Sequence, residues 1–240
     1  MRAHAAVVAA PSDDGCSFPT LRSDPPLLLR PTPFGLFLQG GAAGPLGGDR
    51  LRLDVEVRAG AHLTVRSAAA TIVLPGGAPS ELAVSVRIEA GAHLDWMPEP
   101  LVSVAGSHHV QRIDIALDED ATLRWHERFV LGRSSEPPGR LDGTIRVERG
   151  GVALLHQQLR LGDRDDRESW MSAAVVGDAR AVVSEVRVGE RAPGAPIVRR
   201  GDDGVGRSAC LAVGVDATLL QAIDRDLASA SALVLELAPA

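Results

Sequence analysis

Two histidines occupy equivalent places in a repeated segment of this chain, and their spacing is the first that suggests chemistry. The tetrapeptide Gly-Ala-His-Leu at residues 60–63 recurs with the same letters at residues 91–94, 31 residues later. If the two copies form neighbouring strands, the side chains of His62 and His93 should lie about 5–6 Å apart. Two imidazoles at that distance can bind a borderline metal such as Ni²⁺ or Zn²⁺. The plainer interpretation, which the sequence favours, is a polar residue facing solvent beside a turn.

Two other polar pairs are weaker candidates for chemistry. His108 and His109 follow a glycine in an expected loop, and adjacent side chains on an extended chain point apart, so they form a poor chelate. His126 and Glu127 resemble half of a zinc-protease motif whose second histidine is missing, and we interpret them as ordinary surface residues. Nucleophile-elbow, P-loop and dinucleotide-binding motifs are also missing from the sequence. The sequence therefore predicts that the protein is not an enzyme.

A glycine-rich stretch at residues 40–49 ends in Asp49. Such a loop can cradle phosphate through its backbone N–H groups. A strand, not a helix, is expected to follow it, and the carboxylate of Asp49 would repel an anion. We therefore expect a structural turn, or else a loop that places Asp49 at an interface or in a polar channel.

The elements that carry these residues follow from the repeat. Turn-like tetrapeptides begin at residues 60, 91, 120 and 151, at intervals of 31, 29 and 31 residues, and alternating apolar and polar residues precede each one. Alternation with a period of two indicates half-buried strands, so the repeating unit is strand, tight turn, strand. Side chains two apart share a face, which predicts a common core from the following pairs: Leu63/Val65, Leu94/Trp96, Leu123/Trp125 and Leu154/His156.

The fold class predicted from this pattern is mainly β, an open β-helix-like scaffold of stacked sheets built from strand-turn-strand repeats of ~30 residues. One or two short α-helices are expected near the C-terminus, the longest from residue 217 to about 237 with Asp216 as its cap. We expect a single domain over residues 1–240. It divides into an N-terminal extension (1–26), the repeat region (27–162) and C-terminal strands with a helix (163–240).

Composition restricts the function classes. The net charge is −6 and no cluster of basic residues stands out in the sequence, so nucleic acid is not an expected partner. Cys16 and Cys210 are far apart, which excludes a disulfide framework and suits a reducing cytosol. The mildly apolar N-terminus does not have the features of a secretory signal, and no apolar run reaches ~18 residues, so neither export nor a membrane span is expected.

Several short motifs together resemble the family of urease accessory proteins called UreD, or UreH in some organisms. Its glycine stretch ending in Gly-Asp is similar to Gly47, Gly48 and Asp49, and its Ala-Ala-Thr motif to residues 69–71, which end at Thr71. Its Leu-Glu-Trp-Leu-Pro-Gln segment is similar to residues 94–99. The matching positions there are Trp96, Pro98 and Glu99, with Glu99 in place of the usual Gln. Residues 131–133 (Leu-Gly-Arg) and 139–141 (Gly-Arg-Leu) also match, so the chain is identified as a divergent member over residues 27–162.

The resemblance implies an assembly function. Such proteins bind apo-urease and the accessory proteins UreF and UreG, and they are β-helical scaffolds with polar tunnels proposed to pass Ni²⁺ to the urease active site. In this chain the implied metal contacts are transient, with no tightly bound cofactor. The candidates are Asp49, Glu99, His62 and His93. The oligomeric state, a homodimer included, is left open.

Two alternatives remain at this stage. The first is a β-repeat module that binds proteins unrelated to urease. The second is a β-fold enzyme with a histidine-bound metal, although the closely spaced His-x-His and Glu of cupin enzymes do not occur in the sequence.

Overall fold

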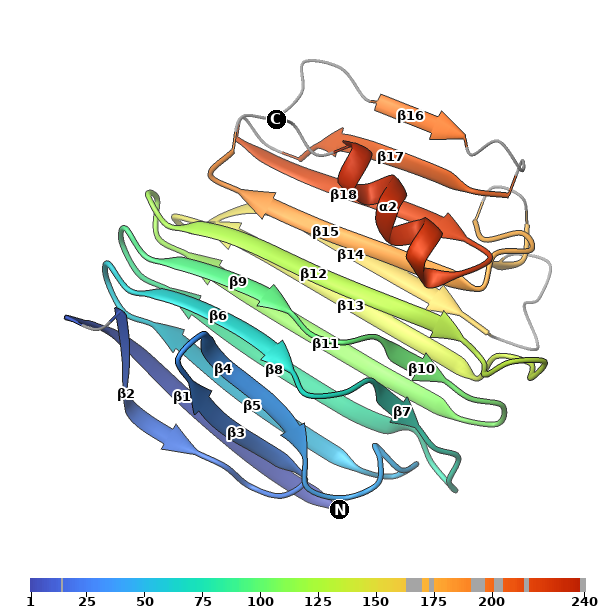
Figure 1. Cartoon of the computed structure of the whole chain (residues 1–240), viewed down its shortest axis with the longest axis horizontal. Helices are drawn as coiled ribbons and strands as arrows, with labels where there is room; N and C mark the ends of the chain where they lie inside the picture. Colours follow the sequence, from blue (N-terminus) through green and yellow to red (C-terminus); the bar gives the residue numbers. More distant parts are fainter. Residues whose placement is uncertain are drawn as a thin grey trace.

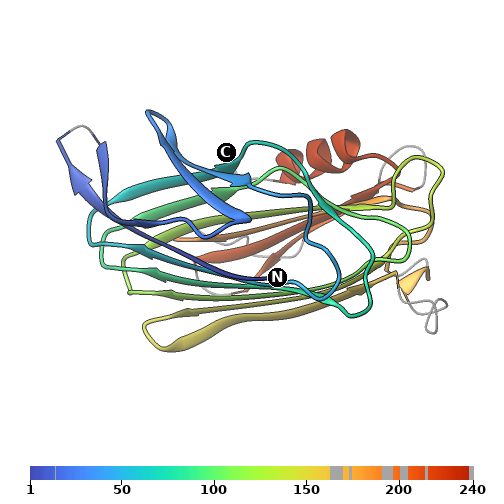
Figure 2. The same ribbon diagram turned by 90° about the horizontal axis from the view of Figure 1, so that it is seen from below.

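The computed structural model describes residues 1–13, 15–162, 170–172, 175–190, 197–200, 205–213 and 216–237. In this part of the chain the strands form two sheets that face each other (Figures 1 and 2). Sheet A has seven strands in the spatial order β14-β13-β11-β8-β5-β1-β2. Their bounds are β1 Arg2–Ser12, β2 Gly15–Arg22, β5 Arg50–Val57, β8 Ser80–Ile88, β11 His108–Leu117, β13 Arg140–Arg149 and β14 Val152–Leu161.

Sheet B has eleven strands among the described residues, nine of them in the order β16-β17-β18-β15-β12-β9-β6-β4-β3. Their bounds are β3 Leu27–Thr32, β4 Gly35–Gly40, β6 His62–Ser67, β9 His93–Met97, β12 Thr122–Leu131, β15 Ala181–Val188, β16 Ile197–Arg200, β17 Arg207–Ala212 and β18 Ala217–Asp224. The short strands β7 (Thr71–Val73) and β10 (Leu101–Ser103) pair with each other, and β10 also pairs with β12.

The repeat builds coils that cross from one sheet to the other. β5 leads through a turn to β6, β8 to β9 and β11 to β12, and equivalent strands of successive coils pair in parallel. β1 and β4 occupy the corresponding places of a first coil, since β1 is parallel to β5 and β4 to β6. The turns need glycine where φ is positive, as at Gly60 (φ 71°) and Gly91 (φ 64°). The predicted β-helix-like fold is therefore confirmed, and residues 1–26 supply two strands of sheet A.

The core lies between the sheets, as the repeat predicts. Leu63, Leu94 and Leu123 are at most 2% exposed. They pack in one cluster with apolar side chains from both sheets, including Trp96 and Trp125. The predicted core face is therefore confirmed for the first three copies of the repeat.

The fourth copy does not follow the prediction. β14 turns back and pairs antiparallel with β13 inside sheet A, with a register shift at Leu154. The two residues between these strands, Gly150 (φ 56°) and Gly151 (φ 79°), both have positive φ, which suits a tight two-residue hairpin. As a result Leu154 is only partly buried against the core and His156 is exposed.

The predicted helix over residues 217–237 is wrong in its first half. Residues 217–224 form β18, a central strand of sheet B that is largely buried because α2 (Leu227–Leu237) packs on its outer side (Figure 1). A strand covered on both faces loses its alternation, so its periodicity cannot be told from that of a buried helix. The cap is Asp226, whose carboxylate accepts the backbone N–H of Ser229 at 2.9 Å, whereas Asp216 pairs with Arg149.

Candidate functional site

The space between the sheets contains polar side chains as well as the apolar core. Glu127 comes two residues after Trp125 on β12, so it points to the same interior side. From sheet A, Gln111 of β11 reaches across, and its Nε2 donates a hydrogen bond to Glu127 Oε1 at 2.5 Å. This contact joins the two sheets through their interior.

A small cavity of about 20 Å³ adjoins Glu127. A space of this size holds about one water molecule. Its wall comes from both sheets and includes two glutamines and a serine beside the carboxylate. The lining residues are Glu127, Phe129, Gly143, Thr144, Ile145, Gln157, Leu159, Ser184 and Gln221.

Glu127, Gln111 and His109 form a polar row between the sheets, and burial sets the pKa values of its two ionisable members, Glu127 and His109. Loss of solvation raises the pKa of Glu127 to about 7, although the hydrogen bond from Gln111 opposes the rise. Further along β11, His109 is fully buried and its Nδ1 lies 2.8 Å from Ser80 Oγ. Burial, together with the charge of His108, lowers the pKa of His109 to about 4, so this imidazole is neutral at physiological pH. The Nε2 atom of His109 has no hydrogen-bond partner among the described residues.

Two sequence interpretations are corrected here. His108 and His109 lie in a strand, not in a loop, although their side chains do point to opposite sides as expected. Glu127 is an interior residue, not an ordinary surface one. The signal was present in the sequence, because Leu123, Trp125 and Glu127 continue one face of a strand with a period of two.

The outer face of sheet B carries a network of charges. Glu185 of β15 is fully buried and pairs with Arg124 of β12 at 3.0 Å and with Arg187 at 2.5 Å. His126 is the register partner of Glu185. Burial lowers the pKa of His126 to about 4, with the neighbouring arginines contributing, although the charge of Glu185 opposes this. The prediction that His126 is an ordinary surface residue is therefore also wrong, because its ring is largely buried.

His62 and His93 lie side by side on this outer face, as the repeat predicts. They are register partners on β6 and β9, and their ring centroids are 5.8 Å apart. His93 Nδ1 lies 2.6 Å from Thr122 Oγ1, and its Nε2 lies 3.4 Å from Asp95 Oδ2. The hydrogen bond from His93 lowers the pKa of Asp95, with Arg124 and Arg66 adding to the effect, although partial burial opposes it.

The glycine-rich loop forms a packed turn. A Cβ at Gly47 would lie 2.5 Å from the Cα of Gly76, so the two backbones touch, and Gly48 has a φ of 92°. Asp49 is 5% exposed and accepts hydrogen bonds from the Met1 ammonium at 2.7 Å and the Leu46 N–H at 2.9 Å. Burial alone would raise the pKa of Asp49, but these two hydrogen bonds lower it below its ordinary value.

Of the remaining family-motif positions, Thr71, Pro98 and Glu99 lie in the segments that follow β6 and β9, whereas Trp96 lies within β9. The Thr71 N–H donates to the carbonyl of Pro100 at 2.9 Å, and the Pro98 carbonyl accepts a hydrogen bond from Arg128 at 2.7 Å. The Glu99 carboxylate is 3.4 Å from the guanidinium of Arg128. Trp96 stacks on Trp125 in the core.

The four predicted metal contacts do not gather in one place. His62 and His93 are adjacent, but Asp49 precedes β5 while His62 follows the turn at its other end, about 25 Å away along the strand. Glu99 likewise lies beyond the far end of β9 from His93. Among the described residues no group of three or more His, Cys, Asp or Glu side chains is placed to hold a metal.

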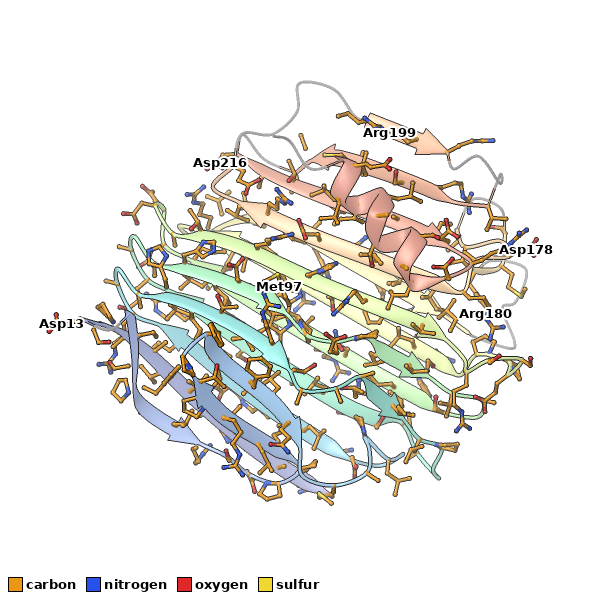
Figure 3. The ribbon with its side chains drawn as sticks, viewed as in Figure 1. Asp13, Met97, Asp178, Arg180, Arg199 and Asp216 are labelled. Carbon is orange, nitrogen blue, oxygen red and sulfur yellow. The ribbon has the colours of Figure 1, made fainter. Side chains whose placement is uncertain are left out.

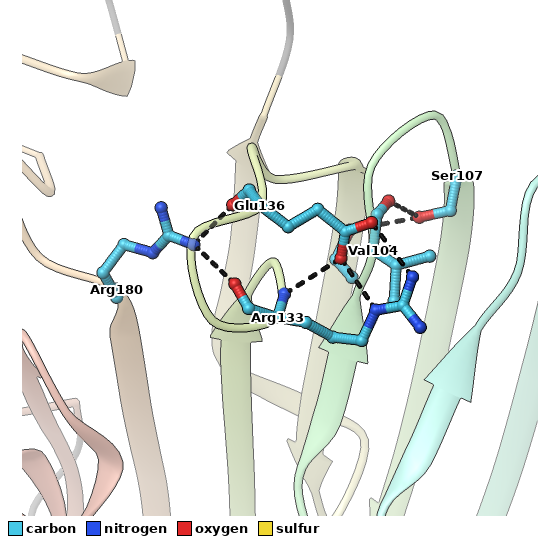
Figure 4. Close-up of polar contacts among 6 residues, drawn as sticks. Val104, Ser107, Arg133, Glu136 and Arg180 are labelled. Carbon is cyan, nitrogen blue, oxygen red and sulfur yellow. Dashed lines mark hydrogen bonds and ion pairs between the residues drawn. The ribbon is translucent and has the colours of Figure 1, made fainter.

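The loop between β12 and β13 is held by the contacts of two arginines (Figure 4). Arg180 Nη2 donates to the backbone carbonyls of Arg133 at 3.1 Å and Glu136 at 2.6 Å. The guanidinium of Arg133 binds the Glu136 carboxylate through two nitrogens, at 2.9 and 3.1 Å, and this contact lowers the pKa of Glu136 to about 2. The loop borders a hollow of about 540 Å³ that is mostly apolar and lies away from Glu127.

These features define a class of protein, a two-sheet β-solenoid scaffold with a polar row inside it. No described helix has the length and apolar character needed to cross a membrane. The family model for the UreD urease accessory protein matches residues 2–236. The chain belongs to the UreD family.

Individual relatives agree with this assignment. The chain is 42% identical over 174 residues to a urease accessory protein UreD of Parafrankia, an alignment that covers 63% of this chain and 58% of that protein. It is 41% identical over 175 residues to UreD of Streptomyces avermitilis, covering 70% and 69% of the two chains. It is 35% identical over 235 residues to UreD of Frankia casuarinae, covering 83% and 73%.

Proposed function

We propose that this protein is an assembly factor for urease and not itself an enzyme. It acts in the cytoplasm, where it binds apo-urease together with the accessory proteins UreF and UreG and helps to deliver Ni²⁺ to the urease active site. The observation that carries this proposal is the UreD family match over residues 2–236, on a scaffold that presents two broad sheet faces.

We propose further that the polar row between the sheets is part of the route taken by the cation. Glu127 supplies a carboxylate, held by the Nε2 of Gln111, and Ser184 supplies a neutral hydroxyl oxygen in the wall of the same cavity. Oxygen donors of this kind bind a borderline cation loosely, whereas a closed set of thiolates and imidazoles would retain it. A pKa of about 7 also lets Glu127 exchange a proton for a metal ion near physiological pH.

The metal roles of Asp49 and Glu99 stay predictions. Each carboxylate already has a cationic partner, the Met1 ammonium for Asp49 and Arg128 for Glu99, and a metal ion would have to displace it. In the structure these two ion pairs hold the loops at the ends of the coils. Glu127, which lies on the interior face, is therefore the better residue for testing passage of the cation.

Co-purification with apo-urease, with and without UreF and UreG, tests the assembly role. Wild-type protein should be retained with the urease subunits, and the urease should gain nickel. Failure of the folded chain to bind apo-urease under either condition would remove the proposal and favour a β-repeat module for unrelated partners.

The cation route has its own test. Glu127→Gln should keep the complex but lower the nickel found in urease, and Glu148→Gln on the exposed face of β13 is the matched control. Equal nickel loading by both variants would exclude Glu127 from the route while leaving the assembly role intact.

A further inference from the structure

The His62–His93 pair has the spacing of two ligands that share one metal ion. With metal–nitrogen distances of 2.0–2.1 Å, two imidazoles on one ion have ring centroids roughly 5 to 6.5 Å apart. The observed separation is 5.8 Å, with the rings tilted by 38°. In the part of the chain that the structure describes, no other pair of histidine rings is in contact.

The contact of His93 Nδ1 with Thr122 orients the ring so that Nε2 can bind a metal ion. His93 has two tautomers, and in one of them Nε2 carries the proton and faces Asp95 Oδ2. When the proton is on Nδ1 instead, Nδ1 donates to Thr122 Oγ1 at 2.6 Å and the lone pair of Nε2 is available for a metal ion. A metal-bound histidine commonly donates its other N–H to such a partner, which fixes the ring and its tautomer. Thr122 is the register partner of His93 on the next coil, so the sheet itself sets this orientation.

A carboxylate lies beside Nε2 of His93. Asp95 Oδ2 is 3.4 Å from His93 Nε2. Two ligand atoms that each lie about 2.1 Å from a tetrahedral metal ion are about 3.4 Å from one another, which matches this separation. His62 has an exposed side chain with no hydrogen bond to other described residues, so its ring can turn toward the same point without breaking a contact.

We propose that His62 and His93, with Asp95 beside them, form an exposed binding site for a divalent transition metal of borderline softness, completed by water. Because no group of three such side chains is preformed among the described residues, the site is weak and exchangeable. It lies on the outer face of sheet B, separate from the interior row around Glu127, and α2 covers a different part of that sheet (Figure 1). Figure 3 places Met97, two residues beyond Asp95, near the middle of the same face. The proposal does not depend on the urease role.

Copper is the most sensitive probe, because Cu²⁺ binds nitrogen and oxygen sites more tightly than Ni²⁺ or Zn²⁺. Calorimetric titration of the full chain with Cu²⁺ should show a site that His62→Ala or His93→Ala weakens at least about tenfold, as loss of a ligand or its support does in metal sites. The electron paramagnetic resonance spectrum of the bound Cu²⁺ should lose the splitting from one nitrogen in each variant.

Two further variants complete the experiment. Thr122→Val should weaken binding about tenfold, because it removes the partner that orients His93. His156→Ala, which removes an exposed histidine on β14, should leave affinity and spectrum unchanged. If His62→Ala and His93→Ala bind Cu²⁺ as the wild type does, with circular dichroism confirming that all variants fold, the proposed site is wrong.

Discussion

Trp96 and Trp125 stack face to face across adjacent coils, with ring centroids 4.5 Å apart and planes within 4° of parallel. They occupy the same place in successive repeats and are register partners on β9 and β12. Trp96 is 6% exposed and Trp125 1% exposed. The stack therefore links two coils in the middle of the core.

Replacing Trp125 by Ala should lower the free energy of unfolding by about 3–5 kcal/mol, because it leaves a large cavity under the neighbouring coil. Urea unfolding measures this loss, and near-ultraviolet circular dichroism should lose the signal of the coupled indoles. Phe34→Ala, at the exposed turn between β3 and β4, is the control and should change stability by less than ~0.5 kcal/mol. A loss below ~1 kcal/mol for Trp125→Ala would contradict the packing described.

The repeat made this part of the fold predictable. Leu63, Leu94 and Leu123 could be assigned to the core from the sequence because each follows a turn at the same distance and alternation fixes its face. The same regularity predicted the approach of His62 to His93. Local periodicity is sufficient where one face of a strand is buried and the other is exposed.

The features that were missed depend on information beyond that periodicity. β18 is covered on both faces, so its sequence has no alternation to distinguish it from a helix. The turn of the fourth repeat contains Gly150-Gly151, a two-residue hairpin signal, whereas its likeness to the other three turns predicts one more crossing between the sheets. The His126-Glu127 pair resembles a fragment of a motif, but the position of Glu127 two residues after Trp125 on the strand places its side chain inside.

Gly47→Ala tests the contact between two loops at the start of the coils. The added Cβ would lie 2.5 Å from Gly76 Cα and 2.7 Å from the carbonyl oxygen of Ala78, and these backbone atoms cannot move aside cheaply. We expect a loss of roughly 2 kcal/mol or more in unfolding free energy, as for other overpacked sites. Gly77→Ala is the control, since its added Cβ would meet nothing within 4 Å, and similar stabilities for the two variants would disprove the contact.

His126 should make the protein sensitive to acid. Its pKa is about 4 when folded and about 6.5 when unfolded, so between these values the unfolded chain binds the extra proton. Its contribution to stability is complete above pH 6.5 and is lost as the pH falls toward 4, on the order of 3 kcal/mol in all. The difference in unfolding free energy between wild type and His126→Gln, followed from pH 7.5 to pH 4, measures this share. The exposed His156→Gln should show no such trend, and a flat difference for His126→Gln would count against its burial.

Glu127 should make the folded protein less stable as the pH rises, the opposite of His126, because burial raises the pKa of Glu127 from 4.5 to about 7. Between those values the folded state holds a proton that the unfolded state has released, so the contribution of Glu127 to stability falls as the pH rises. Glu127→Gln keeps the shape and cannot ionise. Its stability relative to wild type should therefore be nearly constant below pH 4.5 and increase by on the order of 2–3 kcal/mol up to pH 8. Chemical unfolding of both proteins across this range tests the prediction, with Glu148→Gln as the exposed control. A relative stability that does not depend on pH would mean that the Glu127 carboxylate is solvated in the folded protein.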